Sequence, residues 1–226
     1  HAEEIVGQAI TGYDRSKLFI VSKVADVNLR YDDVLKSFAS SLKRLQTDYL
    51  DLYLIHAPNP KISIQETMRA MDKLKAEGLI KAIGVSNFNV SQMKEAQANS
   101  QNKIVANQLH YNLIVREVER KGILAYCQKN DIFLIAWRPL DTGSLAKPGM
   151  PVLDRIGKKY HKSPAQVAIN WLISQTNVVT LSKMKSAIHL QDNLGATNWQ
   201  MDKNDIEELI KEYPGQKDVS DVCPLL

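Results

Sequence analysis

The sequence predicts a parallel α/β fold closed as a (β/α)₈ barrel, the TIM barrel, and three observations lead to it. Short β-branched runs alternate with amphipathic segments along the 226 residues, which indicates a parallel sheet. The ten glycines stand singly, so no glycine-rich loop supports a dinucleotide-binding doubly wound sheet. A polar or reactive side chain lies at or near the C-terminal end of nearly every run. In a barrel those ends meet on one face, and we therefore favour the barrel.

Six segments have the residue composition of β-strands. Each is a short run rich in β-branched, leucine and aromatic residues, followed by a turn and a helical segment. The predicted strands are residues 18–24, 49–56, 82–87, 105–111, 133–137 and 178–183.

Amphipathic helices are predicted in the gaps between these strands. In residues 32–45, Val34, Phe38 and Leu45 belong to an apolar set spaced by three and four, which places them on one helix face. Ser163 followed by Pro164 predicts an N-cap and a first helical position. The predicted helices are residues 2–11, 32–45, 64–77, 91–99, 117–130, 152–160, 164–175 and 203–212.

The charge distribution argues against nucleic acid and membranes as partners. The 29 Lys and Arg residues are mixed with 25 Asp and Glu residues, and the net charge is only +4. No apolar run approaches the roughly 20 residues of a spanning helix, and residues 1–10 do not resemble a signal peptide. We expect a cytoplasmic protein that forms a single domain over residues 1–226.

The two cysteines predict neither a disulfide framework nor a metal site. Cys127 lies in a predicted helix and Cys223 among the last four residues, so the pair has no metal-binding spacing. We expect both to be reduced thiols without a role.

Polar residues at the predicted strand ends are candidate functional residues, and each has a structural alternative. Lys23 ends an apolar strand, where burial lowers the pKa of a lysine unless a carboxylate pairs with it; alternatively it reaches solvent. His56 either acts at the barrel face or is a satisfied core group. Ser86 and Asn87 either bind an amide, such as the nicotinamide carboxamide, or cap the next helix.

The later strands carry comparable candidates. Gln108 offers the same amide chemistry, and Trp137 offers a flat face for a nicotinamide unless it is an ordinary core aromatic. Lys183, with Lys185 and His189, either meets a phosphate or belongs to a solvated basic loop. These strand ends offer no pair of Asp or Glu residues, so a hydrolase with paired carboxylates has no support.

Taken in order, these residues lie in motifs that resemble the aldo-keto reductase family over essentially the whole chain. The motifs are YLDLYLIHAP (49–58), GLIKAIGVSNF (78–88), NQLHYN (107–112), SPAQVAINWL (163–172) and the segment 183–193. The resemblance implies a TIM barrel whose members use NADPH, without a metal, to reduce aldehydes and ketones to alcohols.

The resemblance also implies a role for each candidate. Lys23 matches the lysine that lowers the pKa of a catalytic tyrosine, and His56 matches the histidine that orients the carbonyl and shares the proton relay. Ser86, Asn87 and Gln108 match the residues that hold the carboxamide. The other implied cofactor residues are Trp137 at the stacking position, Arg138, Leu140 and Thr142 over the pyrophosphate, Lys183 and His189 near the 2′-phosphate, and Asp192 and Asn193 at the adenine.

The sequence departs from the family pattern at the phosphates. His189 stands where the family usually has an arginine on the 2′-phosphate, and Met184 replaces a neighbouring serine. Because Lys183 and Lys185 keep an attraction for that phosphate, we favour NADP over NAD. Asp141 stands where a small residue is usual, and its charge repels the pyrophosphate unless a basic neighbour neutralises it.

In the family, the catalytic aspartate and tyrosine lie in a segment resembling DTA-x-x-Y-G, which precedes the first helix of this sequence. Residues 1–4 look like the continuation of that segment. Six of eight strands are therefore expected here, with no tyrosine at the donor position. We favour a longer natural polypeptide. The alternatives are a short variant that keeps NADP binding without catalysis, and exchange of strands between copies.

We therefore predict NADP(H)-dependent reduction of aldehydes and ketones by hydride transfer. The alternative is a catalytically inactive NADP-binding regulatory or partner protein. The short C-terminal segment predicts an open site for small carbonyl substrates. Neither the individual substrate nor the oligomeric state follows from the sequence.

Overall fold

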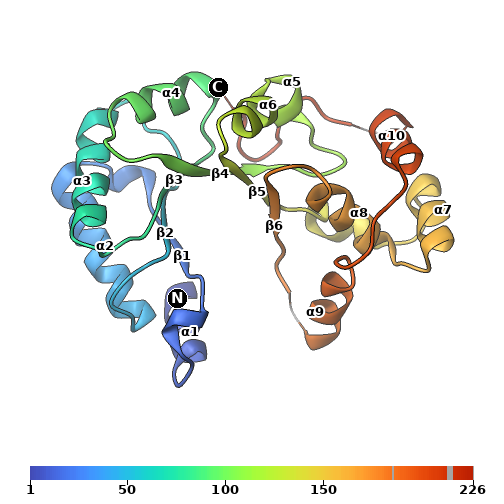
Figure 1. The fold of residues 1–226 in the computed structure, drawn as a ribbon, viewed down its shortest axis with the longest axis horizontal. Coiled ribbons are helices and arrows are strands. Elements are labelled where there is room, and N and C mark those ends of the chain that lie inside the picture. The colour runs from blue at the N-terminus through green and yellow to red at the C-terminus, as the bar shows by residue number, and fades with distance from the viewer. Residues whose placement is uncertain (185, 213–215, 226) are drawn as a thin grey trace. The chain divides into compact units, whose positions relative to one another are not determined.

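The computed structural model describes residues 1–184, 186–212 and 216–225. The chain forms two compact units, His1–Asn107 and Gln108–Leu226, and both contain strands connected through helices (Figure 1). The single domain predicted over residues 1–226 stays a prediction.

The first unit is built on parallel strands. In sheet order they are β1 (Val21–Val24), β2 (Leu52–Ile55), β3 (Ile83–Ser86) and the start of β4 (Ile104–His110). Lys23 lies beside Leu54, and Leu54 beside Gly84. Gly84 is required by close packing, because a Cβ there would lie 2.4 Å from Leu54 Cδ2 and 2.9 Å from the carbonyl oxygen of Ala106. The strands run in one direction, so β1, β2 and β3 end at the same edge.

Four helices of the first unit pack in chain order beside these strands (Figure 1). They are α1 (Ala2–Ile10), α2 (Tyr31–Leu45), α3 (Ile64–Ala76) and α4 (Val90–Ala98). The apolar face predicted for α2 is buried, and Phe38 meets the ring of Tyr53 edge-on at 5.1 Å. Gly7 of α1 lies against α2, where a Cβ would come within 2.4 Å of the Arg44 carbonyl oxygen. Asn89 begins α4 with a capping box.

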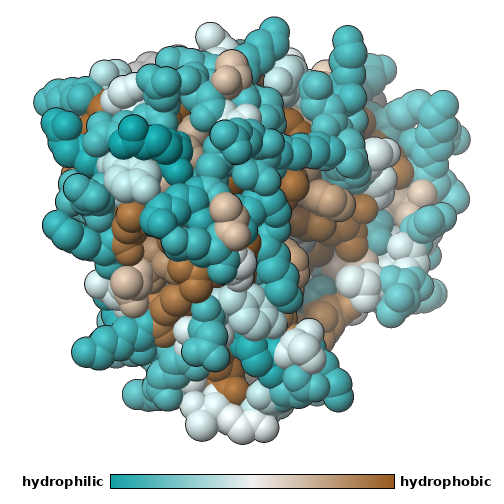
Figure 2. Space-filling model, turned by 60° about the vertical axis from the view of Figure 1, so that its left-hand side comes forward, coloured by the Kyte–Doolittle hydropathy of each residue, from teal (hydrophilic) through white to brown (hydrophobic). Residues whose placement is uncertain are grey.

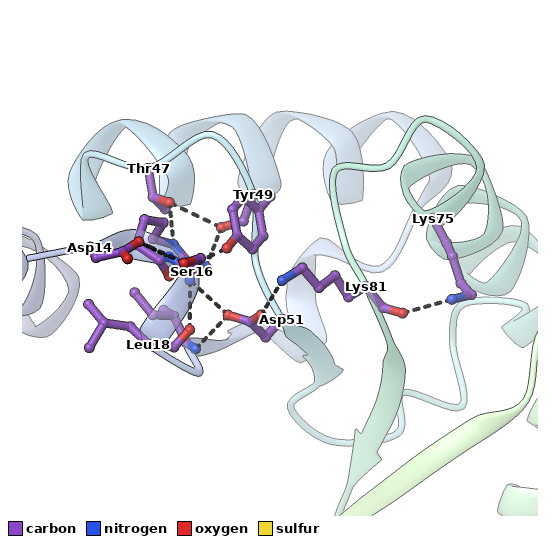
Figure 3. A network of polar contacts seen from close by, with 10 residues as sticks. Asp14, Ser16, Leu18, Thr47, Tyr49, Asp51, Lys75 and Lys81 are labelled. Carbon is purple, nitrogen blue, oxygen red and sulfur yellow. Dashed lines mark hydrogen bonds and ion pairs between the residues drawn. The ribbon is translucent and has the colours of Figure 1, made fainter.

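A buried carboxylate joins the segments that precede the first three strands (Figure 3). Asp51, 4% exposed, accepts the Ile20 backbone N–H at 2.9 Å and pairs with Arg15 at 2.9 Å and Lys81 at 3.0 Å. Burial alone raises the pKa of Asp51, but these three donors outweigh it and hold that pKa below its ordinary value. The N-terminal ends of the strands are therefore joined by paired charges.

The second unit continues the strand–helix pattern. Its strands are the end of β4, then β5 (Phe133–Trp137) and β6 (Val178–Leu181), and β5 and β6 are parallel with Ala136 beside Thr180. Its helices are α5 (Glu117–Arg120), α6 (Ile123–Lys129), α7 (Pro151–Tyr160), α8 (Pro164–Ile173), α9 (Ala187–Leu194) and α10 (Lys203–Glu212). The predicted Ser163 cap of α8 is confirmed as a capping box with Gln166.

All six predicted strands are present, and two differences from the predicted helices have physical causes. The helix predicted over 117–130 is divided into α5 and α6, because Gly122 has φ +67° and interrupts the helical backbone. Helix α9 was not predicted as a helix. It has no buried residue, and its apolar Ile188 and Leu194 are exposed, so the sequence carries no core-facing stripe there.

The face drawn in Figure 2 is mostly hydrophilic, with hydrophobic residues in smaller patches. Within the described ranges, no helix has the length and apolar character needed to cross a membrane.

Candidate active site

In the first unit, Lys23 is the third residue of β1 and is partly buried. Among the described residues its ammonium has no hydrogen bond or ion pair, and burial lowers its pKa. The predicted strand-end lysine therefore has no carboxylate partner among the residues that the structure describes.

His56 follows β2 at the same edge and is exposed. Its backbone N–H donates to the Val24 carbonyl at 2.9 Å, which fixes it beside the end of β1. Partial burial, followed by the positive charge of Lys23, lowers the pKa of His56, and Asp26 opposes this effect. The imidazole is therefore neutral near pH 7 and can form a hydrogen bond with a polar ligand atom.

Asn87 follows β3 with a left-handed backbone, φ +61°. Its Nδ2 donates to the His56 carbonyl oxygen at 3.0 Å and to Ser86 Oγ at 3.1 Å, and these bonds hold the side chain in place. Its Oδ1 is buried and has no hydrogen-bond partner within residues 1–184, 186–212 and 216–225. Because an unsatisfied buried acceptor is costly, this oxygen is suited to an N–H donor from a ligand. The first unit thus brings His56, Ser86 and Asn87 into contact, with Lys23 acting electrostatically on His56.

In the second unit, the ends of β4 and β5 hold an aromatic pair. Gln108 is buried in β4, and two residues further on His110 is only 3% exposed. The His110 ring stacks on Trp137, with 4.3 Å between centroids and 16° between planes. Trp137 remains partly exposed. The tryptophan is therefore more than a core aromatic, because one of its faces is supported by a buried ring while part of the side chain stays accessible.

The loop after β5 has an unusual backbone. Arg138, Asp141, Thr142 and Gly143 all have φ between +42° and +100°. Runs that mix left-handed and right-handed residues turn backbone N–H groups into a concave anion-binding arrangement. The loop is held at its start by Asn112, whose Nδ2 donates to the Arg138 carbonyl oxygen at 2.8 Å.

The Asp141 carboxylate of this loop accepts a hydrogen bond from Ser144 Oγ at 2.9 Å. The neighbouring Leu140, predicted to cover a pyrophosphate, accepts the Gly143 N–H at 2.8 Å through its carbonyl oxygen. Its side chain is partly buried, whereas Thr142 is exposed. Thr142 is therefore accessible from solvent, whereas the N–H groups of Asp141 and Gly143 are bonded within the loop.

The predicted phosphate and adenine residues lie after β6. Lys183 is exposed, and His189 is exposed in the first turn of α9, whose N-cap is Ser186. Asp192 is committed in part to the fold, because it accepts the Ser163 hydroxyl of α8 at 2.9 Å. Asn193 follows it in α9. Lys185 lies outside the described residues.

Sequence reasoning missed His110 and Asn112, although both lie in the NQLHYN motif. Asn112 Oδ1 accepts the backbone N–H groups of Ile114 and Val115, which fixes the direction of its amide. In the residues that the structure describes, no group of three or more His, Cys, Asp or Glu side chains could hold a metal ion.

Comparison with known proteins gives a consistent result. The sequence matches the Aldo/keto reductase family over residues 1–212. A methylglyoxal reductase of Escherichia coli is 35% identical over 220 residues, which cover 96% of this chain and 76% of that protein.

Solved structures agree. A thermostable aldo-keto reductase crystallised with the inhibitor epalrestat is 43% identical, with a TM-score of 0.90 over 93% of this chain and 77% of that one. An aldo-keto reductase from Klebsiella pneumoniae in complex with NADPH is 32% identical, with a TM-score of 0.86 over 96% and 78% of the two chains. These likenesses confirm the predicted fold class.

Proposed function

Because the chain belongs to the aldo/keto reductase family, we propose that it is an NADP(H)-dependent oxidoreductase that reduces small aldehydes and ketones to alcohols. The observation that carries the proposal is the buried, unpartnered Oδ1 of Asn87 beside the Lys23–His56 pair. Reduction of a carbonyl needs a held hydride donor and a polar group at the carbonyl oxygen. These residues are of the types that meet those two needs.

The residues at hand fit a nicotinamide cofactor. The carboxamide has the N–H donor that Asn87 Oδ1 lacks, and we assign Ser86 and Gln108 to the same group. Trp137 would support the ring by stacking. When bound, NADPH supplies the hydride. The left-handed loop from Arg138, including Leu140 and Thr142, would cover the pyrophosphate.

We assign the adenosine end to the segment after β6. Lys183 and His189 would bind the 2′-phosphate, and Asp192 with Asn193 would face the adenine. Because histidine replaces the usual arginine, we expect a preference for NADP over NAD that is smaller than a lysine–arginine pair would give.

We assign two roles at the carbonyl. The neutral imidazole of His56 orients the substrate by a hydrogen bond to its oxygen, and the Lys23 ammonium stabilises the negative charge that develops there. The general acid is assigned to no residue of this sequence. The similarity to a methylglyoxal reductase favours small dicarbonyl compounds as substrates.

The test is a titration of NADPH followed by tryptophan fluorescence, and then an assay of NADPH consumption with methylglyoxal. We expect quenching, turnover, and a loss of turnover of about 10²-fold or more in His56→Ala with NADPH binding retained. No quenching with either NADPH or NADH would refute the assignment of a nicotinamide cofactor.

A second function, NADP binding without catalysis as a regulatory or partner protein, is favoured by one observation. Lys23 has no carboxylate partner among the described residues, so the polar relay of the family is incomplete there. Quenching without turnover on a panel of aldehydes and ketones would select this alternative. The cytoplasmic location stays a prediction.

A further inference from the structure

The C-terminal tail, residues 216–225, is attached to the segment that follows β4. Lys217 donates its backbone N–H to the Ile114 carbonyl at 2.6 Å and accepts from the Arg116 N–H at 3.0 Å. The carboxylate of Glu117, only 1% exposed, accepts the N–H groups of Ser220 at 2.8 Å and Leu225 at 3.0 Å. The tail is therefore fixed along its described length rather than lying loosely on the surface.

One side chain of the tail reaches the aromatic pair. Ser220 is 3% exposed, and its Oγ lies 2.7 Å from His110 Nδ1. The same oxygen accepts the Cys223 N–H at 3.0 Å. A bond this short between two buried groups constrains the imidazole ring from the tail side.

The other ring nitrogen is constrained from the loop side. Asn112 Nδ2 lies 3.4 Å from His110 Nε2, and it can only donate, because its partner atom Oδ1 accepts two backbone N–H groups. Nδ1 therefore faces Ser220 Oγ, and Nε2 faces the amide nitrogen of Asn112. Each ring nitrogen is matched to one neighbour, so the plane of His110 is set by the tail and by Asn112 together.

That plane is the one on which Trp137 rests. The two rings are 4.3 Å apart and nearly parallel at 16°, so a tilt of the imidazole must move the indole or open a gap in the stack. Trp137 is the residue assigned above to support the nicotinamide. A chain of direct contacts thus runs from Ser220 through His110 to the proposed cofactor surface.

We propose that His110 is a positioning residue through which the docked tail sets the indole of Trp137, so that docking of the tail and binding of the nicotinamide ring stabilise each other. The inference rests on the proposed function for the identity of the ligand. The linkage has to act in both directions: removing the Ser220 contact weakens NADPH binding, and NADPH slows opening of the tail.

The experiment compares Ser220→Ala, His110→Phe and the double variant with the unmodified protein. Phenylalanine keeps a ring against Trp137 but cannot bond Ser220. We expect each single variant to weaken NADPH binding about fivefold or more. The double variant should be no weaker than the worse single variant, because both remove the same contact. Ser174→Ala, which removes a hydroxyl bonded to the Trp171 carbonyl in α8, is the matched control and should leave binding unchanged.

Hydrogen exchange supplies a readout other than affinity. In the unmodified protein, bound NADPH should slow exchange of the amides of Ser220, Cys223 and Leu225, and this protection should disappear in His110→Phe. Unchanged NADPH affinity in both single variants, or additive losses in the double variant, would overturn the inference.

Two further readouts distinguish failure of this inference from failure of the proposed function or of folding. If the unmodified protein binds no NADPH, the proposed function fails, and near-ultraviolet circular dichroism still tests the contact chain. Ser220→Ala should change the tryptophan signal, and in a Trp137→Phe background it should not. No change in the original background would overturn the inference. If Ser220→Ala does not fold, His110→Phe carries the same test.

Discussion

The two ends of the strands in the first unit contrast sharply in how their charges are satisfied. Where the strands begin, Asp51 is buried with a cation on each side and a backbone donor. Where they end, Lys23 is partly buried and Asn87 keeps a buried oxygen, and the described residues supply neither a carboxylate for the first nor a donor for the second. Saturated polar groups contribute to stability, whereas unsatisfied ones cost stability and are retained where a ligand satisfies them. We therefore propose that one end serves stability and the other serves ligand binding.

The largest effect is expected where the charges are paired. Asp51→Ala leaves the Ile20 N–H without its acceptor and removes the ion-pair partner of Arg15 and Lys81. The free energy of unfolding should therefore fall by about 3 kcal/mol, as measured by urea denaturation. Asp48→Ala is the control, since Asp48 is exposed on the same segment and should change stability by less than about 0.5 kcal/mol. Equal effects in the two variants would contradict the division between the strand ends.

At the other end, Asn87 tests ligand binding rather than stability. Asn87→Gly keeps the left-handed backbone but removes the amide, so NADPH affinity should fall about tenfold, or about 1.4 kcal/mol. Asn177→Gly is a matched control, because Asn177 also has a positive φ, +60°, and directly precedes β6. Fluorescence titration measures both. A similar loss of affinity in the control would remove Asn87 from the proposed site.

These contrasts also show which features a sequence can predict. The six strands and the buried face of α2 follow from local periodicity, because residues two or four positions apart share one environment. Strands β1 and β2 begin later than predicted: the predicted ranges include Ile20 and Asp51, but both residues precede these strands and belong to the charge network. Local β propensity does not distinguish a ladder residue from the segment leading into it.

The candidate residues at the strand ends were found from the sequence, but their partners were not. The bond between His110 and Ser220 joins residues 110 positions apart, and such a contact leaves no periodic signal. The left-handed backbone of Asn87 is also invisible in the residue type alone, although asparagine tolerates it better than most residues. Sequence patterns therefore indicated which groups are present, and the fold determined which of them remain unsatisfied.

The next largest effect is expected at Lys23, where removing the charge should raise stability, whereas removing the charge of Asp51 should lower it. Lys23→Met keeps the length of the side chain and removes a partly buried charge that no described residue pairs with, so stability should rise by up to about 1 kcal/mol. Lys36→Met, an exposed lysine of α2, should change stability little. If the proposed function holds, the same Lys23 variant loses turnover. Destabilisation by Lys23→Met would show that the ammonium is paired in solution.

The smallest expected effect is the pH dependence of the stability difference between Lys23→Met and the unmodified protein. The folded-state pKa of Lys23 lies below the ordinary value of 10.5, because burial disfavours the charged form. Between these two values the unfolded chain binds more protons than the folded one, so the stability of the unmodified protein rises with pH through this window and levels off above about 10.5. The advantage of Lys23→Met should therefore shrink as unfolding is measured from neutral pH toward pH 10. A stability difference between the two proteins that stays constant with pH would mean that Lys23 keeps an ordinary pKa in solution, as expected if a carboxylate pairs with it.

Repeating the series at higher protein concentration then shows whether that carboxylate belongs to a second copy of the chain, because only pairing between copies depends on concentration.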